Sequence, residues 1–473
     1  MAAANSHIRA STTWIVLTDF VCLLLGGGAA VGMRIGLAGF SSYFLDHVDG
    51  LLVFVASIIL ANYLAGSYRL QSSFSRFNLV ITWLFSLAFA LIMLSITSYA
   101  WFEILLGRGV LLAWVTSYSI LSLASKMFVY RALFRSLMFQ CKTAIVGVDG
   151  RALELRQILE NRFVLPAHKV VAFIRLVDNR PAENERTRET LGGITVIETT
   201  ASGINRLVRR LGVNLLVVAI KGSEMTRLYP QLRRLRFEGV EVLTPLSVYE
   251  LYSGRTPLDL INDEALTALS LESGLPMMRR VKRVIDIVLS LTAGVLILPL
   301  AVVVGLAIKL SSPRSPVLYT QLRVGQFGKT FRIYKFRTMY DNAEQTTGPV
   351  WAAADDKRIT RLGRFLRQYR IDELPQLINV LKGEMSLVGP RPERPSISVD
   401  LAKKIPFFEE RENVMPGLTG WAQIRYPYGS SLEDAIRKLE YDLYYIKHVS
   451  LSLDLQIILS TLRIVLLGKE RRV

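Results

Sequence analysis

Long apolar stretches dominate the first 135 residues of the chain. They lie at about 14–36, 50–68, 79–101 and 109–130. Each is close to the roughly 20 residues that a helix needs to cross the hydrocarbon core of a bilayer. A soluble helical bundle is the alternative, but four such segments in so short a region leave too little polar surface to cover them. We therefore predict a four-helix transmembrane domain over residues 1–138.

Basic residues between these stretches predict their orientation. Arg9 precedes the first stretch, Arg69 and Arg76 lie between the second and third, and Lys126 and Arg131 end or follow the fourth. The other two loops carry acidic residues beside their single arginines. Because basic residues favour the cytoplasmic side, both the N-terminus and everything after the fourth stretch are expected in the cytoplasm.

A different pattern, in which short apolar runs alternate with amphipathic stretches, begins near residue 140. Buried strands are predicted at 143–147, 170–174, 215–220 and 240–243, and helices at 152–162, 201–211 and 229–238. Strands that alternate with helices indicate a parallel sheet with crossover helices. We predict a Rossmann-like α/β domain over 139–255 and a linker over 256–278.

The first predicted strand leads into a glycine pair that only partly matches a dinucleotide-binding fingerprint. The segment reads Gly147-Val-Asp149-Gly150, whereas the fingerprint GxGxxG needs a small residue at position 149. An aspartate there opposes an anionic ligand. We interpret the domain as structural or regulatory without dinucleotide binding, and keep a ligand-sensing role as the alternative.

A fifth apolar segment, Val284 to Leu310, is long enough to span a bilayer. Basic residues flank it on both sides, from Arg279 to Arg283 and from Lys309 onwards, and Pro299 lies near its middle. A single crossing would put one basic flank on the wrong side, and a proline bends a helix. We predict a re-entrant helix–break–helix over 282–311, with Pro299 at the break, and keep a fifth crossing as the alternative.

Composition limits the classes of protein and of binding partner that fit the chain. The mean hydropathy is +0.34, and the net charge of +18 indicates an anionic partner such as nucleic acid, phosphate or lipid. Two cysteines and four scattered histidines exclude a disulfide scaffold and argue against a zinc enzyme. The basic residues are spread over cytoplasmic flanks without a nucleic-acid recognition motif, so we expect no nucleic-acid partner.

Two basic patterns precede the candidate chemistry. Gly328-Lys329-Thr330 resembles the end of a P-loop, but Arg323 occupies the place of its first glycine, so we interpret the segment as a hairpin turn. Arginines then recur about every third residue from Arg358 to Arg370, with apolar residues between them. On a helix this pattern favours docking to a membrane surface or attraction of phosphate.

The candidate chemistry centres on Asp372 and Glu373, which precede a helical pattern of apolar residues and Pro375. A capping pair is the simplest interpretation of two carboxylates at a helix start. An aspartate kept ionised by that field and by nearby arginines could instead attack phosphorus, and the pair could hold Mg²⁺. Pro390 and Pro392 fix the backbone of Arg391, whose guanidinium suits a phosphate.

Four ordered motifs then carry a resemblance to a known family. They are Lys335-Phe-Arg-Thr-Met, Asp372-Glu-Leu-Pro-Gln, the segment from Leu381 to Pro392, and Pro416-Gly-Leu-Thr-Gly-Trp-Ala-Gln. Together they resemble the bacterial sugar transferase family, the monotopic phosphoglycosyl transferases. The resemblance covers about 279–473, where it implies an α+β catalytic domain. The added spans and the Rossmann-like domain are similar to the large members, which start exopolysaccharide or O-antigen synthesis.

The resemblance implies a role for each matching residue. Asp372 would attack the β-phosphate of a UDP-sugar, releasing UMP and forming a covalent phosphosugar intermediate, and Glu373 would bind the Mg²⁺ cofactor with it. Undecaprenyl phosphate would then accept the hexose phosphate, with glucose or galactose as the sugar. The implied phosphate-binding residues are Lys335, Arg337, Arg391 and, just after the same motif, Arg394. The enzyme would lie in the bacterial inner membrane as a multi-pass protein, with its catalytic domain on the cytoplasmic face.

Three further expectations concern structure and assembly. The family breaks its re-entrant helix at a Ser-Pro pair, whereas Leu298 precedes Pro299 here. Asp442, on a predicted helix, is expected to support the site, and 454–467 is expected to form an interfacial helix or, alternatively, a core helix. A homodimer is compatible with the membrane and middle domains. The rival function is a non-catalytic membrane scaffold or ligand sensor for polysaccharide assembly.

Overall fold

The computed structural model describes residues 2–36, 38–64, 76–100, 107–135, 141–161, 168–177, 186–220, 223–261, 276–340, 358–426, 429 and 431–467. The chain divides into two compact units, Met1–Ser253 and Gly254–Val473. The domain and linker boundaries predicted from the sequence, 1–138, 139–255, 256–278 and 279–473, stay predictions. Each unit is described by itself below.

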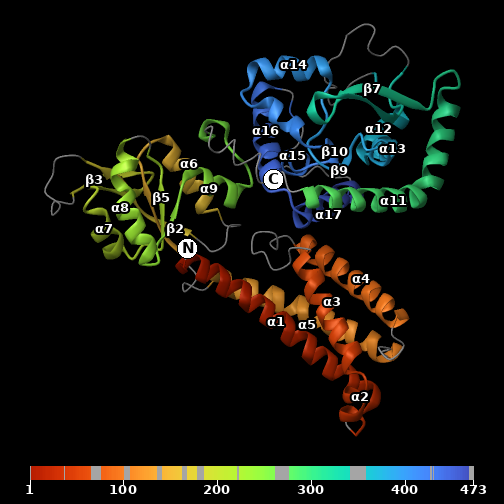
Figure 1. The fold of residues 1–473 in the computed structure, drawn as a ribbon, viewed down its shortest axis with the longest axis horizontal. Coiled ribbons are helices and arrows are strands. Elements are labelled where there is room, and N and C mark those ends of the chain that lie inside the picture. The colour runs from red at the N-terminus through yellow and green to blue at the C-terminus, as the bar shows by residue number, and fades with distance from the viewer. Residues whose placement is uncertain are drawn as a thin grey trace. The chain divides into compact units, whose positions relative to one another are not determined.

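Helices lie where the sequence predicts the four apolar stretches. They are α1 (Ala2–Ile35), α3 (Val48–Leu64), α4 (Arg76–Ala100) and α5 (Arg108–Arg135), with a short α2 (Phe40–Asp46) after the first. Helix α1 lies beside α5, and α3 beside α4 (Figure 1). Among the described residues, Val16–Ile35 is long and apolar enough to span a bilayer, and α2 with α3, bent by 74°, would together make another such span. The membrane character is supported, while four crossings stay a prediction.

A buried polar network connects all four long helices of this bundle. The Asp19 carboxylate, on α1, accepts hydrogen bonds from Asn62 Nδ2 on α3 and from Ser122 Oγ on α5, each at 2.7 Å. Lys126 Nζ lies 3.5 Å from the same carboxylate, and Ser86, on α4, donates to the Asn62 amide oxygen at 2.7 Å. An unpaired polar group costs free energy in an apolar interior, so this network favours one arrangement of the four helices.

A six-stranded sheet forms the rest of the first unit, as Figure 1 shows. Its order is β3-β4-β2-β1-β5-β6, and all neighbouring pairs are parallel except β3–β4. The strands span Cys141–Val146 (β1), His168–Leu176 (β2), Arg186–Leu191 (β3), Ile194–Thr199 (β4), Leu215–Val218 (β5) and Glu241–Leu243 (β6). The predicted strands and the Rossmann-like arrangement are therefore confirmed.

The sequence missed the hairpin of β3 and β4. Strand β3 reads Arg-Thr-Arg-Glu-Thr-Leu and lies at the sheet edge, so it lacks the apolar alternation that marks a half-buried strand. The helices match their predictions within a few residues: α6 (Gly150–Leu159), α7 (Ile204–Leu211) and α8 (Ser223–Phe237). Alternate strand residues pack against α7 and α8, and a short α9 (Pro245–Val248) and a π-helix, η3 (Tyr249–Ser253), end the unit.

The second unit begins with an extended segment, a short 3₁₀ turn η4 (Leu258–Leu260) and the long helix α11 (Pro276–Ser311). The structure describes α11 as one helix that continues through Pro299, and the predicted re-entrant helix with its break at Pro299 stays a prediction. Figure 1 shows that the helix nevertheless changes direction along its length. A proline removes one hydrogen bond and bends a helix without ending it, which accounts for both observations.

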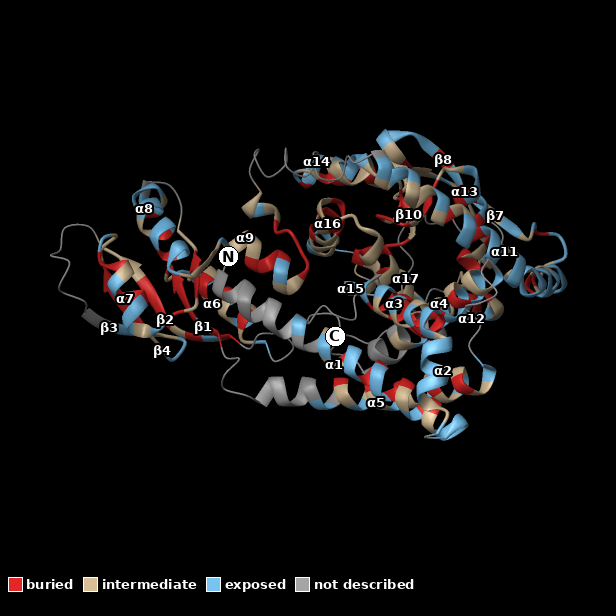
Figure 2. Cartoon of the chain, turned by 60° about the horizontal axis from the view of Figure 1, so that its bottom comes forward, coloured by how far each residue is buried: buried red, intermediate tan, exposed pale blue. Residues whose placement is uncertain are grey.

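Helix α11 exposes its apolar side chains over its middle. Val295 is 72% exposed and Leu296 75%, whereas Val304 and Ile308 are buried against the rest of the unit. Figure 2 shows most of α11 in the colour of exposed residues. Met277–Ser311 is also long and apolar enough to span a bilayer. An exposed apolar surface of this length indicates contact with lipid.

The remaining elements build an α+β domain around the site. Strands β7 (Leu318–Val324) and β8 (Thr330–Phe336) form an antiparallel hairpin, which confirms the predicted hairpin turn at η5 (Gln326–Gly328). Strands β9 (Ser386–Val388) and β10 (Gly417–Thr419) pair in parallel. The helices are α12 (Arg361–Gln368), η6 (Ile371–Gln376), α13 (Leu377–Lys382), α14 (Pro395–Lys404), η7 (Phe408–Asn413), α15 (Trp421–Arg425), α16 (Leu432–Lys447) and α17 (Leu451–Leu467).

Two predicted amphipathic helices differ in their surroundings. Helix α12 exposes Arg361, Arg364 and Phe365 and buries Leu366 against α11, so it has the predicted cationic and apolar faces. Helix α17 instead packs Leu453 and Ile457 into the core shared with α16. The core alternative therefore describes the buried face of α17, and the interfacial interpretation stays a prediction.

Candidate active site

The two candidate carboxylates lie on a short helix between the hairpin and helix α13. Asp372 and Glu373 are in the 3₁₀ helix η6, and their residues are 8% and 7% exposed. The turn is entered through Arg370, whose φ of 52° lies in the left-handed region that non-glycine residues rarely adopt. Such backbone strain persists only where the surrounding structure holds it, and it is often found at functional sites.

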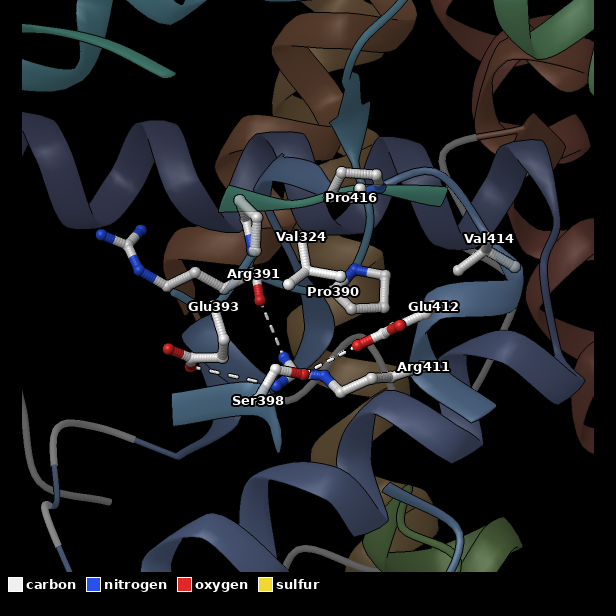
Figure 3. A pocket seen from close by; sticks show the side chains of 11 residues that line it. Val324, Pro390, Arg391, Glu393, Ser398, Arg411, Glu412, Val414 and Pro416 are labelled. Carbon is white, nitrogen blue, oxygen red and sulfur yellow. Dashed lines mark hydrogen bonds and ion pairs between the residues drawn. The ribbon is translucent and has the colours of Figure 1, made fainter. Parts of the chain in front are cut away.

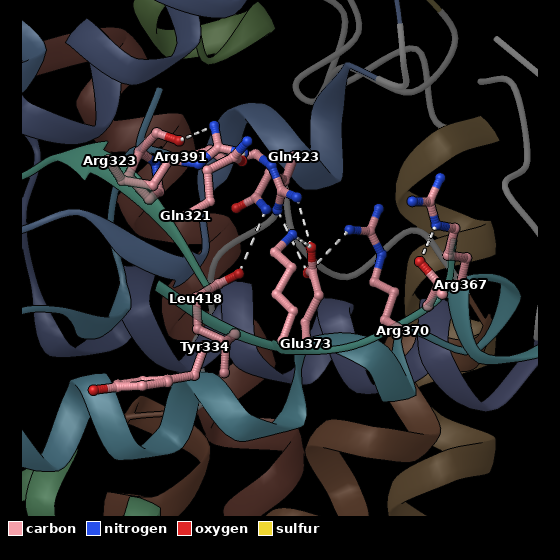
Figure 4. A network of polar contacts seen from close by, with 12 residues as sticks. Gln321, Arg323, Tyr334, Arg367, Arg370, Glu373, Arg391, Leu418 and Gln423 are labelled. Atoms are coloured by element: carbon pink, nitrogen blue, oxygen red, sulfur yellow. Dashed lines mark hydrogen bonds and ion pairs between the residues drawn. The ribbon is translucent and has the colours of Figure 1, made fainter. Parts of the chain in front are cut away.

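Glu373 is surrounded by cationic side chains from three different segments. Lys335 Nζ, on β8, lies 2.9 Å from Glu373 Oε1, and Arg391 Nη2 lies 2.6 Å from the same oxygen. Arg370 Nη1 lies 3.7 Å from Glu373 Oε2. Figure 4 shows the Arg370 and Arg391 side chains directed toward the Glu373 carboxylate. The structure therefore brings the predicted residues Lys335, Glu373 and Arg391 together.

Asp372 differs from its neighbour because, in the described part of the chain, no hydrogen bond or ion pair engages its carboxylate. Burial and, after it, the negative charge of Glu373 raise the pKa of Asp372 to about 6, against the lowering effects of Lys335, Arg367 and Arg391. At pH 7 the ionised form is still favoured by about ten to one. As expected from the sequence, arginines favour the ionised form of Asp372, but burial and Glu373 outweigh them, so the net shift is upward.

For Glu373 and for Lys335, burial and the neighbouring opposite charges shift the pKa in opposing directions. Burial alone would raise the pKa of Glu373, but Arg391 and Lys335 outweigh it and hold the pKa well below its usual range. Burial lowers the pKa of Lys335, against the attraction of Glu373. The site thus contains one carboxylate whose pKa is held low by its bound cations and one whose pKa is raised to about 6.

The loop that carries Arg391 is held at four successive carbonyl groups. Gly417 N donates to Pro390 O at 2.8 Å, and Val324 N donates to Glu393 O at 2.9 Å. The other two donors are arginine side chains: Arg411 Nη2 to Arg391 O at 2.9 Å and Arg323 Nη1 to Pro392 O at 3.1 Å. Two prolines fix the backbone torsions as predicted, and these hydrogen bonds fix the position of the loop.

A glycine pair lets this loop approach β10 closely. A side chain on Gly389 would meet the Met415 carbonyl, and one on Gly417 would meet the backbone of Gly389. Only glycine tolerates such an approach of two backbones. The glycines of the two motifs therefore have a packing role that aligns the Arg391 loop with the site.

Arg411, which the sequence analysis missed, links this loop to the predicted supporting residue Asp442. Arg411 Nη2 lies 2.9 Å from Asp442 Oδ2, and Asp442 is 2% exposed. Burial raises the pKa of Asp442 to about 6, while Arg411 lowers it. Figure 3 shows Arg411 and Glu393 lining a small pocket of about 20 Å³ below the loop. The sequence could have indicated a residue such as Arg411 only indirectly. A buried carboxylate such as Asp442 requires a polar or charged partner.

The other predicted site residues lie elsewhere. Arg337 Nε donates to the Pro316 carbonyl at 3.1 Å. Arg394 precedes α14, and its charge adds to burial and to the Arg391 charge in lowering the pKa of the half-buried Arg323. Pro299 lies within α11. Binding of phosphate by Arg337 and Arg394 stays a prediction.

In the α/β domain, the aspartate of the incomplete dinucleotide-binding fingerprint has a structural contact. Asp149 caps helix α6, since its carboxylate accepts a hydrogen bond from Ala152 N at 3.0 Å. The Asp149 side chain thus takes the helix N-terminus at which a dinucleotide would place its pyrophosphate. This geometry supports the interpretation that Asp149 opposes dinucleotide binding. Whether the domain binds another ligand stays untested.

Comparisons with known proteins match both units. Residues 277–468 match the family model described as bacterial sugar transferase, and residues 63–244 match the model described as CoA-binding domain. The chain is 43% identical over 221 residues to the UDP-N-acetylgalactosamine-undecaprenyl-phosphate N-acetylgalactosaminephosphotransferase of Aeromonas hydrophila, covering 47% of this chain and 51% of that protein.

Two further relatives show the same likeness. The UDP-glucose:undecaprenyl-phosphate glucose-1-phosphate transferase of Escherichia coli (strain K12) is 42% identical over 187 residues, 39% of each chain. The exopolysaccharide production protein PSS of Rhizobium leguminosarum bv. phaseoli is 39% identical over 185 residues, which cover 38% of this chain and 92% of that protein. The chain thus spans about half or less of the length of the first two relatives and nearly all of the third.

Proposed function

Because the chain belongs to the bacterial sugar transferase family, we propose that it transfers a sugar 1-phosphate from a UDP-sugar to undecaprenyl phosphate. The products are UMP and an undecaprenyl-diphosphate sugar, and the reaction is the first membrane step of exopolysaccharide or O-antigen synthesis. The single observation that carries the proposal is the contrast between Asp372, without a partner among the described residues, and the adjacent Glu373, bound by Lys335 and Arg391. A non-catalytic scaffold would not need this contrast.

In the first step Asp372 attacks the β-phosphorus of the UDP-sugar. A bond forms between an Asp372 oxygen and that phosphorus, and the bond to the bridging oxygen breaks, so the electron pair leaves with UMP. The Asp372 carboxylate is ionised at pH 7 and has no described hydrogen-bond donor that would weaken it as a nucleophile. The site's own residues thus supply a charged attacking group that is not engaged by another described side chain.

In the second step the phosphate oxygen of undecaprenyl phosphate attacks the same phosphorus. The bond between Asp372 and phosphorus breaks, and the carboxylate is restored. A covalent intermediate lets a water-soluble donor and a lipid-borne acceptor use one site in turn. Lys335 and Arg391 remain in place on Glu373, where they lower the charge repulsion between the acidic dyad and the phosphate groups.

The residues of the dyad also fit the proposed Mg²⁺ cofactor. Magnesium is usually bound by one or two carboxylates together with substrate phosphates, and Asp372 offers a carboxylate that is not already paired with a described side chain. The described residues contain no group of three or more metal-binding side chains, so the substrate would have to complete the coordination. Asp372 and Glu373 would hold the ion, which would offset the charge of the diphosphate.

The membrane arrangement is part of the proposal. We infer that bent α11 enters and leaves the bilayer on one face, as a re-entrant helix, and that the protein is a multi-pass protein of the bacterial inner membrane with its site on the cytoplasmic face. The exposed apolar middle of α11 and the basic residues on both flanks support this inference.

A protease-accessibility experiment tests this topology. A tag added after Val473 should be protected from protease applied to the periplasmic face of spheroplasts, because both ends of α11 lie in the cytoplasm. A tag in the predicted loop near Asp46, between the first two membrane helices, should be cleaved and serves as the control. Cleavage of the C-terminal tag in intact spheroplasts would support a fifth crossing instead.

The pH dependence of the proposed reaction follows from Asp372. Its active form is the carboxylate, and its pKa is raised to about 6 by burial and by Glu373. We expect kcat/KM for UMP release to fall as the pH decreases through about 6, with nearly full activity above pH 7. A pH profile of UMP release measured in membranes at saturating Mg²⁺ checks this, and a flat profile down to pH 5 would contradict it.

A panel of UDP-sugars tests the proposed reaction itself. Membranes containing the protein, supplied with undecaprenyl phosphate and Mg²⁺, should release UMP from at least one UDP-hexose and form a lipid-linked sugar. The panel should include UDP-glucose, UDP-galactose and their N-acetylated forms, since the sugar is not specified by the residues discussed above. Absence of UMP release from every member, with folded protein present, would overturn the proposal.

A further inference from the structure

The segment that joins the two units is docked into the catalytic unit. Residues Gly254–Thr256, here called the strap, directly follow the π-helix η3. Trp421 Nε1 donates to the Gly254 carbonyl at 2.7 Å, and Thr256 N donates to the Glu440 carbonyl at 3.0 Å. Arg255 is 9% exposed and Thr256 2% exposed. The strap is therefore a buried part of the catalytic unit rather than a free linker.

A glycine is required where the strap meets Trp421. Gly254 has a φ of 66°, in the left-handed region. A Cβ atom there would lie 2.9 Å from the Trp421 ring, which is closer than side chains pack. Both the backbone conformation and the close contact thus fix the strap against the motif that contains Trp421.

Arg255 forms a buried ion pair with helix α16. Its Nη1 lies 2.9 Å from Glu440 Oε2, and both side chains are about nine-tenths buried. Arg437 reaches the same carboxylate oxygen at 2.9 Å, but its side chain is 41% exposed. A buried charge pair is costly to break from one side, because the remaining charge stays desolvated. The position of α16 is therefore coupled to the strap through the Arg255 ion pair as well as through the Thr256 backbone hydrogen bond.

Helix α16 connects the strap to the loop that carries Arg391, because two of its residues face in opposite directions. Asp442 lies two residues after Glu440, and residues two apart on a helix point in nearly opposite directions. Asp442 holds Arg411 at 2.9 Å, and Arg411 donates to the Arg391 carbonyl at 2.9 Å. The Tyr445 hydroxyl, on the same helix, lies 3.2 Å from the Val388 carbonyl, three residues before Arg391. Helix α16 thus has two contacts with the segment that leads to Arg391.

We propose that the strap positions Arg391 through α16, so that Arg255 and Arg411 are positioning residues for the catalytic dyad. Arg391 is the residue through which the effect reaches the reacting group, because it pairs with Glu373 at 2.6 Å. The strap is covalently continuous with the first unit, so a change in that unit can alter the site without a ligand contacting it. This inference rests on the proposed function for its kinetic readout, while its structural readout does not.

The test compares Arg255→Leu with Arg437→Leu, which removes a second but exposed arginine from the same Glu440 carboxylate. Arg255→Leu should lower kcat for UMP release about tenfold, within the range seen for residues coupled to a distant site. It should also move the acid limb of the pH profile to higher pH, because the Arg391 charge lowers the pKa of Asp372 and would be held less closely. Arg437→Leu should change neither quantity more than about twofold.

Hydrogen exchange measured by mass spectrometry on the full-length protein gives the readout that does not need activity. Arg255→Leu should speed exchange in peptides covering 388–394 while leaving the β1–β2 peptides unchanged. Arg255→Lys should restore both the acid limb and the exchange rate toward the wild type. Arg411→Lys should move the acid limb in the same direction as Arg255→Leu, and the double variant should show less than the sum of the two shifts.

Three results would overturn the proposal: an unshifted acid limb in Arg255→Leu, unchanged exchange over 388–394, or an equal effect of Arg437→Leu. If Arg255→Leu does not accumulate as folded protein, Arg255→Gln replaces it with the same expectations. A wild-type protein that releases no UMP would refute the proposed function, and the exchange comparison would still decide whether the strap positions the loop.

Discussion

Asp372→Asn should reduce UMP release by about 10³-fold or more, because asparagine keeps the shape of the side chain but cannot attack phosphorus as an anion. The residue has no described ion pair or hydrogen bond to lose, so the folded structure should survive the change. Removing the negative charge next to Glu373 also leaves the Lys335 and Arg391 contacts intact. The loss should therefore appear in kcat with little change in protein yield.

The measurement is UMP release by equal amounts of membrane-embedded wild type and variant. Asp400→Asn serves as the control, because Asp400 is an exposed carboxylate on α14 of the same unit whose only described ion pair is with Lys404. The control should keep at least half of the wild-type rate, since exposed pairs contribute little. Normal turnover by Asp372→Asn would remove this residue from the nucleophile role.

Glu373→Gln should lower kcat/KM by about 10²-fold, the scale on which loss of one electrostatic group at a reacting centre acts. Glutamine is uncharged, so the Lys335, Arg370 and Arg391 charges lose the anion that holds them together. Leaving cations without their buried partner is costly and should move Arg391 away from its productive position. The effect should thus combine poorer binding of the donor with slower chemistry.

The pH profile gives this variant a distinct signature. The negative charge of Glu373 is the second largest contribution that raises the pKa of Asp372, after burial, and is larger than the lowering effect of any one of the three cations. Its removal should move the acid limb to lower pH, opposite to the shift expected for Arg255→Leu. Glu433→Gln, at an exposed position on α16, is the matched control. An acid limb that stays near pH 6 in Glu373→Gln would contradict the assignment of that limb to Asp372.

The parts of the fold that the sequence predicted are those with a local pattern. Apolar runs identified α1, α3, α4 and α5, and strands with apolar runs identified β1, β2, β5 and β6. Strand β3 was missed because its residues are polar and lie at an edge. The Asp19 network was missed for a different reason: Asp19 and Ser122 are 103 residues apart, so nothing in the local pattern of either helix indicates their contact.

In the candidate site, too, residues within local motifs were predicted and contacts that depend on tertiary packing were not. Lys335, Glu373 and Arg391 belong to separate motifs, and the structure brings the charged atoms of Lys335 and of Arg391 within 3 Å of Glu373 Oε1. Arg411 lies outside the matched motifs, and its contacts to Asp442 and to the Arg391 carbonyl depend on tertiary packing alone. The bend of α11 without a break was likewise not predictable, since proline permits either outcome.

The central claim is that Asp372 carries the sugar phosphate as a covalent intermediate, and an isotope-exchange measurement tests it most directly. Membranes depleted of undecaprenyl phosphate are incubated with an accepted UDP-sugar, Mg²⁺ and labelled UMP. The wild type should transfer the label into the UDP-sugar without any lipid acceptor, and Asp372→Asn should not. Exchange that requires undecaprenyl phosphate, in a protein that otherwise completes the full reaction, would contradict the covalent mechanism.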